Sequence, residues 1–332
     1  MDEADVQTLL ALTIEAARKA GMISKTSVER AIVDTTVMPK AIAPPTDSRL
    51  LERSRQHLVK LADAGGIELR QNDNREAPRL AAQIVHYAHA KQYKRMRKSL
   101  RTLRRRVGRV HREIGRKLHE LPASQQAKAR DLLPHAGRIL TQKTKDKLYA
   151  LHTPEVECIS KGKARTPYEF GVKVTIATTL KEGLVVGMRS MPGNPWDGNT
   201  LAETLEQVSI LADAKPKIAI VDKGYQGVQV DGVRILRSGQ KRGLTRTLHA
   251  MVKRRSAIES TIVHMKSDGR LARNPLKGAT GDAMHAVMCG AGHNIRLLLK
   301  MLRLLCARIP DAIWAWLASI APPDSIAMCA VD

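Results

Sequence analysis

The sequence predicts an α/β fold, a mixed sheet with flanking helices and a basic helical hairpin inserted into the chain. Three observations support this prediction. Short apolar, β-branched runs alternate with segments of helical periodicity. Within residues 217–222, residues 218–221 form a continuous apolar run, which is typical of a strand buried on both faces. Residues 76–121 combine a helical apolar seam with a long run of basic side chains.

The expected elements follow the chain in order. The first half contains a helix over residues 2–20 that ends at Gly21, a strand over 31–38, a helix over about 47–64, a basic helix over 76–121 and a further helix over about 124–147. The second half contains paired strands over 168–179 and 183–189, a helix over about 199–211, a strand over 217–222, and helices over about 245–266 and 281–306.

Composition and charge narrow the class of partner. Apolar residues make up 43% of the 332 residues, so the chain can build a core, whereas aromatic residues reach only 3% and argue against base-stacking platforms. Lysine and arginine number 56 against 32 acids, which gives a net charge of +24. Such a surface attracts polyanions such as nucleic acids. A structural RNA-binding protein would share this charge, so charge alone assigns no chemistry.

Cysteine usage and apolar patterning favour a cytosolic protein without membrane contact. The four cysteines stand far apart and form no C-x-x-C pair, which favours reduced thiols over disulfides or a zinc site. The first residues lack the basic segment of a secretory signal. The apolar stretch over residues 312–321 is too short to span a bilayer.

The basic helix is the first candidate functional element. Its apolar residues recur at gaps of three and four: Met96, Leu100, Leu103, Val107, Val110 and Ile114. Between residues 91 and 117 there are thirteen lysines and arginines and a single acid. A solvated helix face is the alternative, but this ratio favours a surface that lies along a DNA backbone and adds affinity without sequence information. The expected contacts are Lys94, Arg97, Arg101, Arg104 and Arg105.

Three acids form the second candidate site. Asp34 and Asp222 each follow an apolar strand segment, and the carboxyl end of an interior strand is where α/β sheets hold ligands. Glu259 lies on an expected helix between Arg255 and Lys266, at gaps of four and seven residues that place all three on one face. Each acid has an ordinary alternative, because aspartate often begins a turn and an i,i+4 ion pair is common on helix surfaces.

These segments resemble the bacterial insertion-sequence DDE transposases, closest to the insertion-sequence-five group. Residues 221–225 resemble the D-x-G-Y motif of that family, and Arg255, Glu259 and Lys266 match its R-(3)-E-(6)-K signature. Residues 33–36 match the strand of the first aspartate, and weaker similarities occur at 159–165, 192–195 and 292–296. The resemblance covers residues 5 to 305. It departs from the family at Val252, where a tyrosine is usual, and only 33 residues precede Asp34, so we expect a chain that lacks most of the family's N-terminal domain.

The resemblance implies a ribonuclease-H-like fold, cleavage at the ends of a mobile element, and attack of the freed 3′ hydroxyl on target DNA. It implies residues 1–30 as a remnant of an N-terminal helical region, a catalytic domain over 31–75 and 149–308, a basic helical insertion over 76–148, and a C-terminal tail over 309–332. The partners would be the double-stranded DNA of the element ends and the target. The active form would be a homodimer or a higher oligomer.

The chemistry requires an activated oxygen nucleophile and relief of charge on the leaving oxygen. Two Mg²⁺ ions roughly 3.5–4 Å apart supply both, and Mn²⁺ is expected to substitute. We assign Asp34, Asp222 and Glu259 to metal binding and catalysis, with Asp222 as the bridge and Glu259 on the second ion. Carboxylates this close repel one another unless cations neutralise them, so the site should be poorly formed without metal.

The remaining assignments concern DNA contact. Arg255 and Lys266 are expected to bind DNA phosphate or orient a carboxylate, and Tyr225 to touch DNA or to pack beside the site. Two further interpretations stay open: a catalytically silent DNA-binding remnant of a transposase, and a ribonuclease-H-like nuclease that cuts without joining.

Overall fold

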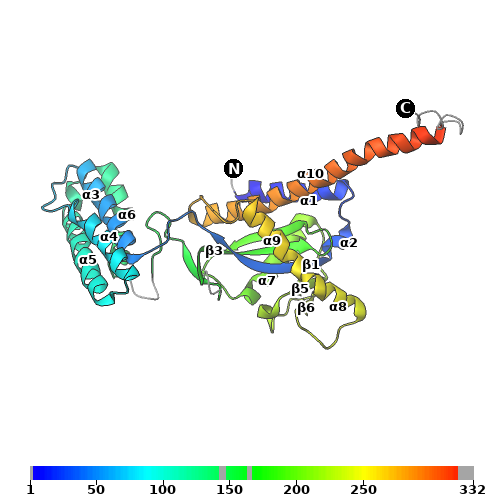
Figure 1. Ribbon diagram of the computed structural model, residues 1–332, viewed down its shortest axis with the longest axis horizontal. Helices are drawn as coiled ribbons and strands as arrows, with labels where there is room; N and C mark the ends of the chain where they lie inside the picture. The colour runs from blue at the N-terminus through cyan, green and yellow to red at the C-terminus, as the bar shows by residue number, and fades with distance from the viewer. Residues whose placement is uncertain (1–2, 142–146, 163–166, 321–332) are drawn as a thin grey trace, which may run out of the picture.

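The computed structural model describes residues 3–141, 147–162 and 167–320, with only the backbone for most of residues 311–320. The similarity at residues 163–165 and the second half of the predicted tail, residues 321–332, therefore lie outside the described residues. The chain forms a unit built on one sheet and a helical unit that stands beside it (Figure 1). Each unit has its own apolar core.

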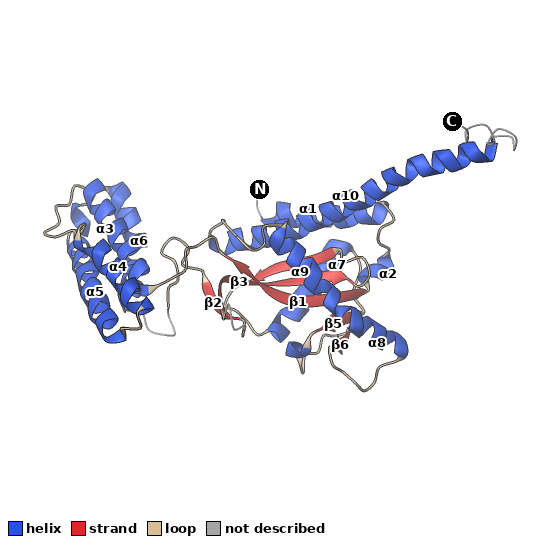
Figure 2. Cartoon of the chain, in the orientation of Figure 1, coloured by secondary structure: helices blue, strands red, loops and turns tan. Residues whose placement is uncertain are grey.

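The sheet is mixed, as the sequence predicts (Figure 2). Its strands are β1 (Arg30–Pro39), β2 (Glu157–Ser160), β3 (Tyr168–Thr179), β4 (Val185–Met191), β5 (Ile218–Val221) and β6 (Arg234–Arg237). The order is β2-β3-β1-β5-β6, and β4 pairs with β3. Strand β3 runs antiparallel to β1, β2 and β4, whereas β5 runs parallel to both β1 and β6. The parallel pairing places the middle of β1 beside the carboxyl end of β5, which positions the candidate site.

Helices cover both faces of the sheet. They are α1 (Glu3–Lys19), α2 (Lys25–Val28), α7 (Leu201–Ala212), α8 (Arg246–Lys253), α9 (Ala257–Ser267) and α10 (Gly278–Ile320). Helix α7 packs on one face of β4, and α10 packs on the other. A Cβ on Gly290 would lie 3.1 Å from Met188, so this glycine permits the close approach of α10 to the sheet.

Helix α1 belongs to the core of the sheet unit. Its buried residues Val6, Leu10 and Ile14 lie in the same apolar cluster as β1 and β5. Asn294 of α10 joins three elements, because its side-chain amide donates to Thr13 of α1 at 3.0 Å and pairs with the backbone of Val185 in β4. The predicted remnant over residues 1–30 is therefore, where described, packed into the sheet unit instead of forming a region of its own.

The unpaired side of β4 is closed by side-chain amides. Asn294 accepts from the Val185 amide and donates to its carbonyl, both at 2.8 Å. On α7, Gln207 makes the equivalent pair with Met188, at 2.8 and 3.2 Å. These contacts satisfy backbone groups that an edge strand would otherwise present to another chain, and they explain why polar residues are buried here.

The helical unit lies between β1 and β2 in the chain. It contains α3 (Asp47–Ala64), α4 (Glu76–His89), α5 (Tyr93–Arg116) and α6 (Ala123–Thr141). Helix α3 contributes Leu51 and Leu58 to the same core as Leu103 and Ile114 of α5. The unit therefore begins near residue 47, whereas the sequence suggested that the insertion begins at residue 76. The predicted hairpin is in fact a bundle to which α3 also belongs.

The predicted helix over 76–121 is interrupted near residue 91. Lys91 has a φ of 55°, and the amides of Lys91 and Gln92 bond back to Ala88 and Tyr87. This is a Schellman-type helix end in which lysine occupies the position usually held by glycine. The sequence therefore carries no glycine or proline to mark the break.

Two further helices differ from their predicted extent. The helix expected over 245–266 is divided by a 3₁₀ turn over Arg254–Ser256, where the Arg254 side chain donates to the Leu180 carbonyl at 3.2 Å. Helix α10 continues to Ile320 and extends beyond the sheet unit (Figure 1). Within the described part of the chain, none of the helices is long and apolar enough to cross a membrane.

Candidate active site

Asp34 and Asp222 are brought to the same edge of the sheet by parallel pairing. Strands β1 and β5 pair with Ile32 opposite Ile220, so each aspartate lies two residues beyond this pair. Strand β5 ends at Val221, whereas β1 continues to Pro39 along β3. Asp34 therefore lies on the side of β1 that β5 no longer covers, next to the loop that carries Asp222.

Arg255 joins Asp34 to Glu259. Its Nη2 donates to Asp34 Oδ2 at 2.8 Å, and its Nη1 donates to Glu259 Oε1 at 3.0 Å. The Asp34 side chain is 13% exposed, whereas that of Glu259 is 60% exposed. One guanidinium thus holds a buried and an exposed carboxylate, and the site has an inner and an outer side.

The environment of Asp34 disfavours its negative charge. Burial raises the pKa of Asp34 most strongly, and the charges of Asp222 and Glu259 raise it further. The guanidinium of Arg255 and the amide of Thr35, which donates to Asp34 Oδ1 at 2.8 Å, act in the opposite direction. The net pKa shift is upward, so Arg255 compensates only part of the cost of gathering these acids.

Asp222 begins the short turn that follows β5. Its Oδ1 accepts from the Gly224 amide at 2.8 Å and caps a 3₁₀ turn over Lys223–Tyr225. The side chain of Tyr225 is completely buried, and burial raises the pKa of its hydroxyl far above the usual range. The structure therefore contradicts DNA contact by Tyr225 and supports the alternative of packing beside the site.

Lys266 pairs with an acid outside the predicted site. Its Nζ lies 3.8 Å from a carboxylate oxygen of Glu169 on β3. Two helical turns separate Lys266 from Glu259, so residues on one face of α9 meet different parts of the sheet. Of the two cations beside Glu259, the structure brings only Arg255 into the acidic cluster.

Asp197 is an acid near the site that sequence reasoning missed. It lies in the 3₁₀ turn over Asp197–Thr200, and its Oδ1 accepts from Thr35 Oγ1 at 3.0 Å and from Lys173 Nζ at 2.9 Å. Thr35 is next to Asp34 in the sequence, and a Cβ on Gly224, two residues after Asp222, would lie 3.6 Å from Asp197 Oδ2, so Asp197 lies near both acids. A lone aspartate before a glycine reads as an ordinary turn, so only its position in space identifies it.

The donor set suits a hard divalent cation. Asp34, Asp222 and Glu259 provide carboxylate oxygens, the ligands that Mg²⁺ prefers. In the described part of the chain, no group of three acidic, histidine or cysteine side chains is arranged at metal-binding distances. The acids therefore fit magnesium by their chemistry. Arg255 lies between two of them, so its guanidinium would have to move before a metal ion could bind there.

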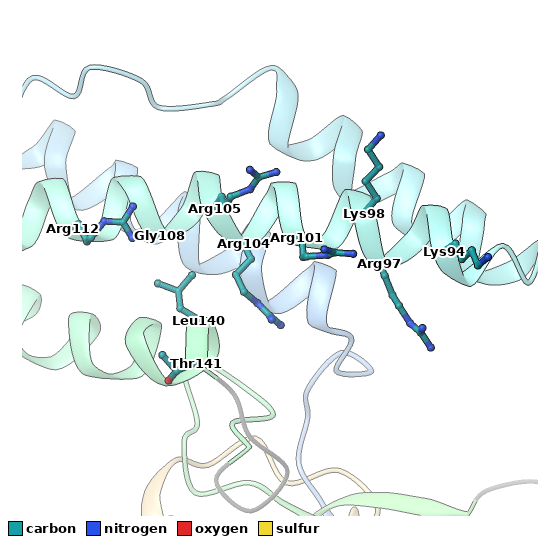
Figure 3. Close-up of a pocket in the computed structure, with 10 residues that line it drawn as sticks. All are labelled: Lys94, Arg97, Lys98, Arg101, Arg104, Arg105, Gly108, Arg112, Leu140 and Thr141. Carbon is teal, nitrogen blue, oxygen red and sulfur yellow. The ribbon is translucent and has the colours of Figure 1, made fainter.

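The helical unit carries a basic groove of about 1020 Å³ (Figure 3). Arg97 and Arg104 extend from α5 toward the side on which Leu140 and Thr141 of α6 lie. The lining residues of the basic groove are Lys94, Arg97, Lys98, Arg101, Arg104, Arg105, Gly108, Arg112, Leu140 and Thr141. All five predicted DNA contacts on α5 line it, and Lys98 and Arg112 join them. The groove is lined by seven cationic side chains and no acid, which suits a phosphate backbone.

Comparison with known proteins bears on the sheet unit. Residues 139–294 match the transposase DDE domain. The DDE domain match includes Asp222, Arg255 and Glu259, and it leaves out Asp34 and the seven cationic residues of the basic groove. The region that carries Asp222 and Glu259 is therefore similar to a transposase DDE domain.

One relative extends the comparison. The uncharacterized protein ORF8 in the nfe locus of Rhizobium meliloti is 50% identical over 88 residues, which are 26% of this chain and 42% of that protein. The match thus spans less than half of the relative's length. No solved structure matches the chain.

Replacing Asp34 by asparagine is expected to raise the thermal stability of the metal-free protein at neutral pH. An acid whose pKa is raised on folding binds more protons in the folded state, so wild-type stability falls as pH rises through that raised pKa. The neutral amide in Asp34→Asn avoids this loss. Thermal unfolding in EDTA at pH 4.5 and pH 7 measures the difference, and a lower Tm for Asp34→Asn at pH 7 would contradict it.

Proposed function

We propose that this protein is the transposase of a bacterial insertion sequence of the insertion-sequence-five group. It would cleave DNA at the element ends and transfer the freed strand to target DNA. The observation that carries the proposal is the convergence of Asp34, Arg255 and Glu259 beside Asp222 at the edge of a mixed sheet. The DDE domain match over two of these acids and the separate basic groove support it.

Asp34, Asp222 and Glu259 would hold two magnesium ions, with Asp222 as the bridging ligand and manganese as a substitute. Bound metal would activate the attacking oxygen and stabilise the leaving oxygen of the phosphodiester. The protein contributes a fixed inner side, because Asp34 is buried on β1 and held by the Thr35 amide. It contributes an adjustable outer side, because Glu259 is exposed on α9. We also propose a ribonuclease-H-like core for the sheet unit.

Arg255 would serve two states of the site. Without metal, it neutralises Asp34 and Glu259 and limits their repulsion. Metal at these carboxylates would repel the guanidinium, which is then free to bind a DNA phosphate beside the reacting bond. Lys266, which lies further along α9 beside Glu169, would contact phosphate outside the acidic cluster.

The basic groove would bind double-stranded DNA through its phosphates and so hold an element end or target near the sheet unit. Such contacts supply affinity without reading bases. This division of labour assigns position to the helical unit and chemistry to the sheet unit. It is consistent with the scarcity of aromatic residues, since base stacking is not required.

A nicking assay tests the proposed function. Purified protein is expected to nick supercoiled DNA that carries the element's ends in Mg²⁺ or Mn²⁺, and EDTA is expected to abolish nicking because the acids cannot act without a cation. Nicking that persists in EDTA would contradict the metal site. DNA binding without nicking in any metal would indicate the catalytically silent remnant.

Strand transfer separates a transposase from a nuclease. A pre-cut end with a 3′ hydroxyl is expected to be joined to a target duplex in Mg²⁺, and the joined product is visible on a sequencing gel. Cleavage without any joined product would favour a ribonuclease-H-like nuclease that cuts and never joins.

The active form is proposed to contain at least two copies, with α10 as the contact. Apolar side chains recur along α10 at gaps of three and four, and Ile295, Leu302, Leu305 and Ile309 are each more than two-fifths exposed. This period allows two identical helices to pack side by side, so the occupant would be α10 of a second copy. Light scattering of the purified protein measures the mass, and a monomer at all concentrations would contradict the dimer.

A nucleoid-associated location in the bacterial cytoplasm follows from the proposed transposase function.

A further inference from the structure

Asp197 connects the segments that carry Asp34 and Asp222. Its Oδ1 accepts from Thr35 Oγ1 at 3.0 Å and from Lys173 Nζ at 2.9 Å. Thr35 follows Asp34 on β1, and Lys173 lies on the neighbouring strand β3. One carboxylate oxygen therefore spans β1 and β3 from the 3₁₀ turn over Asp197–Thr200, a segment distant in sequence from both.

The link to Asp34 runs through Thr35. Successive side chains of a strand point to opposite faces, so Asp34 faces Arg255 and Thr35 faces Asp197. The Thr35 amide donates to Asp34 Oδ1 at 2.8 Å. Asp197 thus holds the Thr35 side chain, and the Thr35 amide in turn holds the Asp34 carboxylate. Asp197 makes this contact from the face of the sheet opposite α9.

The link to Asp222 runs through Gly224. The Gly224 amide donates to Asp222 Oδ1 at 2.8 Å. A Cβ at Gly224 would lie 3.0 Å from Asp222 Oδ1 and 3.6 Å from Asp197 Oδ2, so both carboxylates approach this residue. The turn that carries Asp197 is itself tight, because a Cβ on Gly198 would overlap the Trp196 ring. Glycine at both positions lets the two segments meet.

We propose that Asp197 is a positioning residue that fixes the Asp34 and Asp222 carboxylates relative to each other before metal binds. The inference rests on the proposed function, since it concerns the same metal site. Asp197 is hydrogen-bonded to Thr35 and lies against Gly224, and the Lys173 ammonium balances its charge. Residues that orient metal ligands typically change metal affinity or activity about 10- to 100-fold when they are removed.

Mn²⁺ affinity tests the proposal independently of cleavage. Free Mn²⁺ is measured by electron paramagnetic resonance during titration of the full-length protein without DNA. Asp197→Ala is expected to weaken Mn²⁺ binding about 10-fold or more, as expected for a residue that orients ligands. Thr35→Val removes the hydrogen bond from the other end, leaves the Asp197–Lys173 pair in place, and is expected to weaken binding in the same direction. Asp231→Ala, at an exposed acid outside the site, is the matched control and should bind like wild type.

The double variant Asp197→Ala/Thr35→Val distinguishes positioning from other roles. If Asp197 acts through Thr35, the losses of the two single variants will not add. Wild-type Mn²⁺ affinity in Asp197→Ala would overturn the positioning role and leave the proposed function standing. The same holds if Asp197→Ala loses Mn²⁺ affinity while Thr35→Val keeps it, because that result would mark Asp197 as a direct metal ligand. If the wild-type protein bound no Mn²⁺, or if Asp34→Asn bound it normally, the proposed metal site would fail and the inference with it. A fall in Tm without a change in Mn²⁺ affinity would show a purely structural role and would also overturn it.

Discussion

Replacing Asp222 by asparagine is expected to reduce magnesium-dependent DNA cleavage by on the order of 1000-fold or more, because a neutral amide cannot replace a bridging carboxylate. The substitution preserves shape, and the amide oxygen can still accept from Gly224, so the turn after β5 should keep its geometry. DNA affinity should stay within about 3-fold of wild type, since phosphate binding depends on cations elsewhere. Cleavage of labelled DNA and fluorescence anisotropy measure the two properties.

The control for this variant is Asp231→Asn, which removes one negative charge from an exposed acid outside the site. It separates the loss of a ligand from the change in net charge. Full cleavage by Asp222→Asn, or equal losses in both variants, would contradict the assignment of Asp222. A parallel loss of DNA affinity would instead point to damage in the fold around Tyr225.

The sheet and two of its acids could be predicted because the signals are local. The apolar run of β5 and the β-branched run of β1 mark buried strands, and parallel pairing then places Asp34 beside Asp222. The pair of Arg255 and Glu259 follows from a gap of four residues on a helix, and it survives the 3₁₀ turn that ends at Ser256. Strand and helix periodicity thus accounts for the part of the site that each element supplies on its own.

The remainder depends on contacts between distant segments. Asp197 reaches Thr35 across 162 residues, and no pattern within its own turn records that contact. Tyr225 follows an exposed glycine in the turn after β5, yet it is buried because the turn folds back over the core. The sequence order assigns helix α3 to the catalytic domain over residues 31–75, whereas its apolar face completes the core of the helical unit. Each of these features is decided by tertiary packing, which a propensity or a period does not encode.

Reversing the charge of Arg97, Arg101 and Arg105 together is expected to weaken DNA binding by on the order of 100-fold at 0.1 M salt. All three side chains are exposed and line the basic groove, so the change should leave the core of the bundle intact. Each lost phosphate contact lowers the slope of log affinity against log salt by about 0.9, so the slope should fall by nearly 3. Anisotropy titrations of a duplex at several salt concentrations measure both quantities.

A matched variant on the same helix isolates the groove from net charge. Arg95, Arg109 and Arg116 lie on α5 outside the basic groove, and their replacement by glutamate changes the net charge by the same amount. Long-range attraction depends on total charge and would fall equally in both variants, whereas phosphate contact in the groove is lost only in the first. Equal affinities and equal salt slopes for the two variants would therefore contradict a DNA path through the groove. A selective loss would assign DNA binding to the face between α5 and α6.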